Sequence, residues 1–231
     1  MGANNLRIIV AVRCLNEEKH IKRFLRQYSF ADLIVASDGG STDNSIEMLQ
    51  NKDGVELIHF DGGETINDEF WNTDAPHMNF VLDKAKSHNP DWLIFDDMDS
   101  TPNKHLRENA IEFLEGCDKS QVNVFRLYLW GEGRYFPFMN RNFNMEYTSL
   151  WAWRPSEIDI HADPNEKHGT MLGISGDHCD ILPPSVLLHR SWNPETIDKK
   201  MERYNKIGIK MNHPLQFAGK PVELPDYARE E

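Results

Sequence analysis

The chain has 231 residues, of which 39% are hydrophobic and 10% aromatic, enough apolar side chains for a folded core. Its 25 Lys and Arg residues against 37 Asp and Glu residues leave a net charge of −12, which repels a phosphate backbone. Nucleic-acid binding through a basic face is therefore not expected. The same balance fits an acidic protein that holds a divalent cation.

The cysteines bear on the cellular compartment. Cys14, Cys117 and Cys179 lie far apart and form no CxxC pair. This spacing predicts neither a zinc ribbon nor a disulfide framework, and it favours a reducing compartment. No apolar run approaches the roughly 18 residues that a membrane span requires, and no apolar signal segment opens the chain. We therefore expect a soluble, cytoplasmic protein with no transmembrane span and at most peripheral membrane contact.

Strands and helices alternate in the first half of the predicted structure. Short β-branched runs predict strands, and apolar side chains at helical spacing predict the helices between them. The predicted strands are 6–12, 33–36, 55–60 and 92–95, and the predicted helices begin at 16 and at 43 and span 74–87 and 103–115. This alternation is typical of an α/β fold with a mostly parallel sheet flanked by helices on both faces.

The second half has a different texture. After a predicted strand at 121–130, residues 131–193 are rich in Gly, Pro, His and aromatic residues, and few of their segments are periodic. A helix is predicted over 194–207, and the tail from 214 carries three prolines. We expect a single domain over residues 1–231 whose second half is irregular.

Polar side chains follow three of the predicted strands. Residues 13–17 end the first, Asp38 ends the second, and Asp97 and Asp99 follow the fourth. Ligands of parallel sheets bind at the carboxyl ends of the strands, so we expect these residues to converge. Alternation along an extended chain directs Asp97 and Asp99 to one side and Asp96 to the other. Adjacent carboxylates repel unless a cation neutralises them, and Mg²⁺ or Mn²⁺ prefers such oxygen ligands.

Each of these clusters also has a plain structural interpretation. Asp38 fits a role in shaping the Gly-Gly turn that follows it, and Asn16 and Glu17 fit the start of a helix. Asp97 and Asp99 fit an exposed acidic loop, which is common in a chain of this charge.

Four blocks of the sequence resemble the GT-A-fold family 2 glycosyltransferases, in particular the lipopolysaccharide-core-type members. The first block is Val12-Arg13-Cys14-Leu15-Asn16-Glu17-Glu18, and the second is the turn Val35-Ala36-Ser37-Asp38-Gly39-Gly40-Ser41-Thr42-Asp43. The third is the strand and DXD motif Trp92-Leu93-Ile94-Phe95-Asp96-Asp97-Met98-Asp99. The fourth is Leu187-Leu188-His189-Arg190-Ser191-Trp192, followed by Lys199-Lys200 and Arg203-Tyr204. The matches extend from about residue 6 to 208. The first three blocks are specific in combination, and the last is weaker alone.

The resemblance implies metal-dependent, inverting transfer of a sugar from a nucleoside-diphosphate sugar to an acceptor hydroxyl, with Mn²⁺ or Mg²⁺ as cofactor. It implies that Asp38 accepts a hydrogen bond from the nucleotide base and that Asn16 and Glu17 line the same pocket. The bound cation and nearby basic groups would stabilise the charge of the leaving nucleoside diphosphate.

The resemblance also assigns the groups around the diphosphate. Asp97 would lie near the ribose or the sugar, and Asp99 would bind the metal. His189 would be a further metal ligand or a contact to the diphosphate. Arg13 departs from the commoner Thr or Pro of the family, and either reaches phosphate or pairs with Glu17.

The general base of an inverting transfer must be a carboxylate within hydrogen-bond reach of the acceptor hydroxyl. The candidates are Asp163, Glu166 and Asp177, because the run 161–168 lies about where related enzymes have a His-Glu-type acid. Glu166 is preferred and Asp163 is next, and Asp97 stands with them as a catalytic candidate.

These roles divide the domain. Residues 1–116 are expected to bind the nucleotide sugar and the metal, residues 117–213 the acceptor, and residues 214–231 form a tail. The acceptor is a glycan, a lipid-linked sugar, a protein or a small molecule. The base and sugar of the donor stay open.

Three alternatives remain. Residues 95–101 also resemble the Asp-x-Asp-x-Thr motif of haloacid-dehalogenase-type phosphatases, with Asp97 as nucleophile and Asp99 as acid/base. That motif normally ends a first strand, whereas three predicted strands precede it here. A second alternative is a non-catalytic nucleotide-sugar-binding protein. A third, nucleotidyl transfer to a sugar phosphate, lacks its Gly-rich loop, because residues 13–16 contain no glycine.

Overall fold

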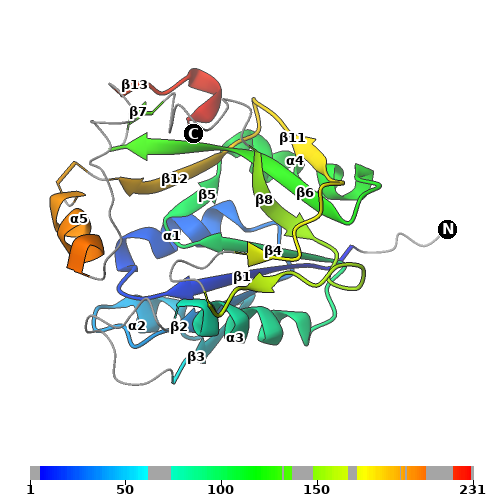
Figure 1. Cartoon of the computed structure of the whole chain (residues 1–231), viewed down its shortest axis with the longest axis horizontal. Coiled ribbons are helices and arrows are strands. Elements are labelled where there is room, and N and C mark those ends of the chain that lie inside the picture. Colours follow the sequence, from blue (N-terminus) through cyan, green and yellow to red (C-terminus); the bar gives the residue numbers. More distant parts are fainter. Residues whose placement is uncertain are drawn as a thin grey trace.

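The computed structural model describes residues 6–61, 74–131, 133–136, 148–165, 171–192, 194–195, 197–206 and 221–229 (Figure 1). The strands are β1 (Ile8–Cys14), β2 (Leu33–Asp38), β3 (Val55–His59), β4 (Trp92–Asp97), β5 (Ser100–Pro102), β6 (Gln121–Trp130), β7 (Arg134–Tyr135), β8 (Thr148–Trp153), β9 (His161–Ala162), β10 (Met171–Leu172), β11 (Cys179–Ile181), β12 (Leu187–Trp192) and β13 (Val222–Glu223). The helices are α1 (Glu18–Gln27), α2 (Ser45–Leu49), α3 (Asp74–Lys86), α4 (Lys104–Gly116), α5 (Ile197–Lys206) and the short 3-10 helix η2 (Asp226–Ala228).

The main sheet has the strand order β13-β7-β6-β8-β4-β1-β2-β3, with β11 and β12 on β6 and β5 on β12. The four strands β4, β1, β2 and β3 pair in parallel. Their register sets Cys14 opposite Asp38 and Arg13 opposite Asp97. The expected fold, an α/β fold with a mostly parallel sheet flanked by helices, is confirmed. The predicted strands of the first half match the observed ones to within a few residues.

Strand β1 is buried on both faces, which explains its unbroken apolar sequence. Ile8, Val10 and Val12 pack in the core under α1 and α4, whereas Ile9 and Ala11 pack against α3 on the opposite face. Helices α1 and α3 lie on opposite sides of β1 (Figure 1). Full burial of each larger apolar side chain contributes about 1.5–3 kcal/mol, so this strand is the centre of both cores.

Strand β8 was missed by the sequence pattern, which predicts few periodic segments between 131 and 193. It lies antiparallel between β4 and β6. The pairing with β6 shifts register between Val122 and Asn123, so that Trp151 is an extra residue on β8. Trp151 therefore joins the core under α1 and α4 while Trp153 joins the core on the α3 face, and both are fully buried. Because β8 has apolar residues on both faces and an extra residue at the bulge, its sequence lacks the alternation of apolar and polar residues that indicates a strand.

The cysteines do not all remain free, and the expectation of no disulfide is wrong. Cys117 and Cys179 form a disulfide with a Cα–Cα distance of 6.2 Å, although they are 62 residues apart in sequence. The parallel pairing of β11 with the start of β6 brings Cys179 beside the end of α4. The reducing compartment was inferred from cysteines expected to be unpaired. The disulfide removes the basis of that inference. Cys14 is free and buried.

No helix in the described ranges of the chain has both the length and the apolar composition that a membrane crossing needs.

Asn103 connects three segments at the start of α4. Its Oδ1 accepts hydrogen bonds from the backbone of Leu106 and of Val186, at 3.0 and 3.2 Å. Its Nδ2 donates to the carbonyl oxygens of Pro184 and Tyr227, at 2.8 and 2.7 Å. Asn103 is fully buried, so this one side chain caps the helix and ties both the loop before β12 and the C-terminal turn to it.

Asn103→Ala should lower the free energy of unfolding by about 2–4 kcal/mol, because it removes a helix cap and leaves buried backbone groups without partners. Urea denaturation measures this loss. Asn109→Ala is the matched control, since Asn109 is a half-buried residue of the same helix whose side-chain amide donates to the His105 carbonyl oxygen. The control should stay within about 0.5 kcal/mol of the wild type. Equal losses in the two variants would contradict the role of Asn103.

Candidate functional site

Asp97, Asp99 and His189 form a cluster that can hold a metal ion, since one ligand atom from each lies within 4.8 Å of the others. Asp97 ends β4, and Asp99 lies in the turn before β5. β12 pairs antiparallel with β5, with His189 opposite Ser100, and this pairing brings the imidazole to the acidic turn. Nδ1 of His189 lies 3.8 Å from Oδ1 of Asp99. Met98 is 2% exposed and points into the core, so the expected alternation of Asp97 and Asp99 is observed.

His189 is held in place by its neighbours. Its ring meets the ring of Tyr128 edge to face, with centroids 5.2 Å apart. The backbone N–H of Arg190 donates to the carbonyl oxygen of Asp99 at 2.9 Å, which ties β12 to the acidic turn. The side chains of Asp99 and His189 are 21% and 12% exposed, and that of Asp97 is 43% exposed. The cluster is thus accessible from solvent at Asp97.

Asp96 points to the other face, as the alternation predicts, and is buried. The Tyr28 hydroxyl donates to its Oδ2, and Nη2 of Arg126 donates to its Oδ1 at 3.3 Å. The backbone N–H of Asp97 also donates to Oδ1, at 3.0 Å. Burial raises the pKa of Asp96 to about 6, against the opposing effect of the Arg126 charge. Asp96 therefore anchors the end of β4 and is not part of the metal cluster.

Arg13 pairs with Asp97, a partner that is neither of the two expected from the sequence, phosphate and Glu17. Its Nη2 lies 3.5 Å from Oδ1 of Asp97, and its guanidinium lies 5.8 Å from the centre of the Phe95 ring. Burial lowers the pKa of Arg13, and the Asp97 charge opposes this effect. The register between β1 and β4 sets these two residues opposite each other, so the pair follows from strand pairing.

Hydrogen bonds of Asn16 join the loop after β1 to the loop after β2, which are the first two segments that carry the family resemblance. Its Oδ1 accepts hydrogen bonds from the backbone of Thr42 and Asp43, at 2.8 and 3.3 Å. Its own backbone N–H donates to the Ser41 hydroxyl at 2.9 Å. Asn16 has φ 57°, a left-handed conformation that asparagine adopts more readily than most residues. Asn16 thus locks the loop after β1 to the loop after β2.

Glu17 adds a third carboxylate to the acidic region. Its backbone N–H donates to the Ser45 hydroxyl at 2.8 Å, and its side chain is 29% exposed. Burial raises the pKa of Glu17 to about 8, and the charges of Asp99 and Asp97 contribute to this rise. A bound cation would stabilise the charged form of such a carboxylate.

Asp38 is 2% exposed, and its carboxylate is engaged by the turn that follows it. Oδ2 accepts hydrogen bonds from the backbone of Gly40 and Ser41, at 2.8 and 3.0 Å. Nδ1 of His59 lies 4.0 Å from the same oxygen. The turn-shaping role is therefore observed, and the contact with a nucleotide base stays a prediction.

His77 of α3 supports the same turn and was missed by the sequence pattern. Its Nε2 lies 3.1 Å from the Ser37 carbonyl oxygen and 2.9 Å from the Ser37 hydroxyl. Its ring stacks on Phe60, with centroids 4.5 Å apart and planes 5° apart. A Cβ added at Gly39 would lie 3.1 Å from Cε1 of His77, so a glycine suits this position. Nothing in the pattern of α3 points to the turn after β2, because only the tertiary packing brings them together.

The candidates for the general base are separated by the fold. Glu166 lies outside the described residues. Asp163 follows β9, where Ala162 belongs to the apolar cluster against which Phe95 packs. Asp177 pairs with Lys119 at 3.1 Å, just before β6 begins. Because β6 runs in the same direction as β4, its start lies at the edge of the sheet opposite Asp97.

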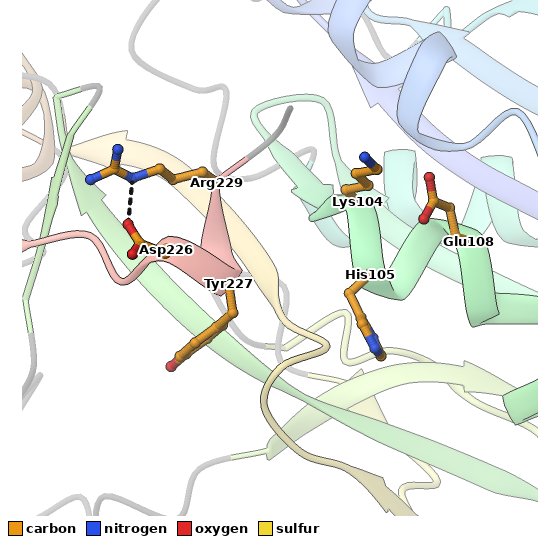
Figure 2. A pocket seen from close by; sticks show the side chains of 6 residues that line it. All are labelled: Lys104, His105, Glu108, Asp226, Tyr227 and Arg229. Carbon is orange, nitrogen blue, oxygen red and sulfur yellow. Dashed lines mark ion pairs between the residues drawn. The ribbon is translucent and has the colours of Figure 1, made fainter.

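Of the two cavities described next, one adjoins the metal cluster and the other lies apart from it. One of about 350 Å³ is lined by Arg13, Asp97 and Arg126 and therefore adjoins the metal cluster. A second, of about 370 Å³, lies between the start of α4 and the C-terminal turn (Figure 2). It is lined by Lys104, His105, Glu108, Asp226, Tyr227 and Arg229. It contains none of the predicted site residues, and its charges partly cancel, as in the Arg229–Asp226 pair at 3.4 Å.

No family model and no curated protein sequence matches the chain. Solved structures do resemble it. The structure of S. aureus TarS residues 1–349 aligns with a TM-score of 0.55 and 16% identity, over 90% of this chain and 67% of that one. The same fragment in complex with UDP aligns with a TM-score of 0.50 and 17% identity, over 78% and 62% of the two chains. The chain thus has the GT-A fold.

A third structure extends the comparison. Glucosyl-3-phosphoglycerate synthase from Mycobacterium tuberculosis, in complex with Mn²⁺, UDP and glucosyl-3-phosphoglycerate, aligns with a TM-score of 0.50 and 16% identity, over 90% of this chain and 82% of that one. The chain spans about two thirds or less of the TarS structures, down to 39% of the longest. The structural resemblance at this GT-A level agrees with the sequence resemblance.

His77 should make stability depend on pH. Burial lowers the pKa of His77 to about 4, from 6.5 in an unfolded chain, and the Arg13 charge adds to this while Ser37 and Asp38 oppose it. The folded state therefore binds fewer protons than the unfolded state between pH 4 and pH 6.5, and the stabilisation present above pH 6.5 is lost as the pH falls.

His77→Phe keeps a ring that can stack on Phe60 and removes the titration. The free energy of unfolding of the wild type, relative to this variant, should rise by about 3 kcal/mol between the two pKa values. Urea denaturation of both proteins across pH 4 to pH 6.5 measures the difference. Parallel pH dependences in the two proteins would show that His77 titrates normally.

Proposed function

We propose that the chain is a metal-dependent glycosyltransferase that moves a sugar from a nucleoside-diphosphate sugar to an acceptor hydroxyl. The observation that carries this is the cluster of Asp97, Asp99 and His189, within 4.8 Å of one another, at the carboxyl edge of a GT-A sheet. The Mn²⁺ and UDP in the matched synthase, and the UDP in the matched TarS fragment, support the same donor chemistry.

Asp99 and His189 are the proposed metal ligands, with Asp97 beside them. Two carboxylates and an imidazole are a donor set that Mn²⁺ accepts, and Mg²⁺ also binds such oxygens. A divalent ion held by these residues would act as a Lewis acid on the diphosphate and would stabilise the charge that develops on the leaving nucleotide. Arg13, already paired with Asp97, adds positive charge at the same point.

Asn16, Glu17 and Asp38 are the proposed wall of the nucleotide pocket. Asn16 holds the loops after β1 and β2 together, and Asp38 shapes the second of these loops. A carboxylate offers about four acceptor sites, so the Asp38 oxygens engaged by Gly40 and Ser41 still have capacity for a base N–H. UDP is the first donor nucleotide to test because the matched complexes contain it.

We further propose that transfer inverts the anomeric carbon, with Glu166 or Asp163 as general base and Asp97 near the ribose or sugar. Of the two base candidates, Asp163 is the one within the described chain, next to the cluster that contains Phe95. Asp177 is disfavoured by its pairing with Lys119 at the opposite edge of the sheet.

In this proposal residues 1–116 bind the donor and 117–213 the acceptor, with 214–231 as a tail. His189 is the exception, since it comes from the second part of the chain and joins the metal cluster. The acceptor is a glycan, a lipid-linked sugar, a protein or a small molecule.

The phosphatase alternative has less support. Its motif would require Asp97 as a nucleophile at the end of a first strand, whereas β4 follows three strands. The hydroxyl of Thr101, the last residue of that motif, accepts a hydrogen bond from Nη1 of Arg190 at 2.8 Å. A non-catalytic binding protein is distinguished by turnover. A panel of nucleotide sugars, incubated with Mn²⁺ and followed for nucleotide release, should reveal hydrolysis or transfer.

Asp99→Asn should weaken Mn²⁺-dependent binding of UDP at least tenfold, on the order of the loss expected when one charged contact is removed. Titration calorimetry of UDP with Mn²⁺ present, and again with a chelator, measures the metal-dependent part of the affinity. Asp83→Asn is the control, because Asp83 is an exposed carboxylate on α3. Wild-type affinity in Asp99→Asn would rule out Asp99 as a metal ligand.

A further inference from the structure

The cavity beside Asp97 is lined in part by residues of β6, β8 and β10, strands that the metal cluster does not use. Its volume is about 350 Å³, within the range of small-ligand sites. Phe95, Leu150 and Met171 form apolar parts of its lining, and Arg13, Asp97 and Arg126 form polar parts. A cavity with both apolar and polar lining residues suits a ligand that presents both C–H groups and hydroxyl groups.

Arg126 of β6 is a basic residue of this cavity that the proposed chemistry has not used. Its side chain is 15% exposed, and its Nη2 donates to Asp96 at 3.3 Å. Its Nε is buried and has no hydrogen-bond partner among the residues that the structure describes. An N–H donor withdrawn from water without an acceptor is costly, and a ligand oxygen in the cavity would relieve that cost.

Arg126 is also held in position. Asp96 receives hydrogen bonds from the Tyr28 hydroxyl and from the Asp97 backbone, so its carboxylate cannot turn away from the guanidinium. The aromatic ring of Tyr28 is fully buried against Phe24, with ring centroids 4.6 Å apart. The hydrogen bonds from Tyr28 and Arg126 to Asp96 therefore hold the Arg126 guanidinium in a fixed orientation at the wall of the cavity.

The order of strands indicates which part of a donor would reach Arg126. The proposed nucleotide pocket lies at the ends of β1 and β2, and the metal cluster lies at the end of β4. β6 and β8 lie on the far side of β4 from β1. A nucleoside-diphosphate sugar that starts at β2 and has its diphosphate at β4 has its glycosyl group beyond β4.

We infer that Arg126 binds the glycosyl group of the donor, through hydrogen bonds to sugar oxygens, and that Asp96 and Tyr28 are positioning residues for it. This inference rests on the proposed function. It adds the residue that recognises the sugar as distinct from the nucleotide.

The test compares UDP with UDP-sugars in the full chain with Mn²⁺. In Arg126→Gln, the dissociation constant of the tightest UDP-sugar from a panel should rise about 10- to 100-fold, the effect of losing a charged hydrogen bond. The dissociation constant of UDP itself should stay within about twofold of the wild type. Arg126→Lys keeps the charge without the fork and should recover only part of the loss.

Arg107→Gln is the matched control. Arg107 is a partly exposed arginine of α4 that bonds Gln27 and Glu108 at 3.0 and 3.2 Å, outside the cavity. It should leave both dissociation constants unchanged. Asp96→Asn should weaken UDP-sugar binding less than Arg126→Gln does, with UDP binding retained, because Arg126 stays present but loses its fixed orientation.

The outcomes separate the inference from the proposed function. Equal weakening of UDP and UDP-sugar in Arg126→Gln would mean that Arg126 acts on the nucleotide or metal, and would overturn the inference. Unchanged binding of both, or a defect confined to the acceptor's KM, would overturn it as well. A wild type that binds no UDP with Mn²⁺ would overturn the proposed function first and the inference with it.

Discussion

The parallel register of β1, β2 and β4 is the constraint on which the site depends. It sets Arg13 opposite both Ser37 and Asp97, so the ends of three strands reach the same level of the sheet. Hydrogen bonds between strands fix this alignment along the whole core, where β1 is buried on both faces. Side chains that are about 20 to 80 residues apart in sequence thus meet at one edge of the sheet.

The same alignment concentrates negative charge. Burial raises the pKa of Glu17 to about 8, and the nearby charges of Asp99 and Asp97 contribute to this rise. Arg13 offsets part of this repulsion through Asp97. Core burial under α1, α4 and α3 supplies the stability that offsets the repulsion within this cluster.

Most of the first half was predictable because its strands and helices have simple periods and sharp ends. Alternation after Phe95 also predicts the opposite directions of Asp96 and Asp97, which the structure has. The pattern could not predict β8, where the extra residue Trp151 breaks the alternation, nor the Cys117–Cys179 disulfide, which depends on β11 lying beside β6. The role of His77 could not be predicted either, because its partner Ser37 belongs to β2 and only the tertiary packing brings them together.

The acidic run at the end of β4 has two different tasks within four residues. A buried ion pair such as Asp96–Arg126 adds little net stability, because removing two charges from water costs about what their attraction returns. The ion pair contributes instead to the orientation of the residues at the end of β4. Asp96 fixes the backbone N–H of Asp97 from the core side, and the alternating geometry then points Asp97 and Asp99 outward at a set spacing. The carboxylate that faces away from the metal cluster thus helps to hold the end of β4, from which Asp97 and Asp99 extend.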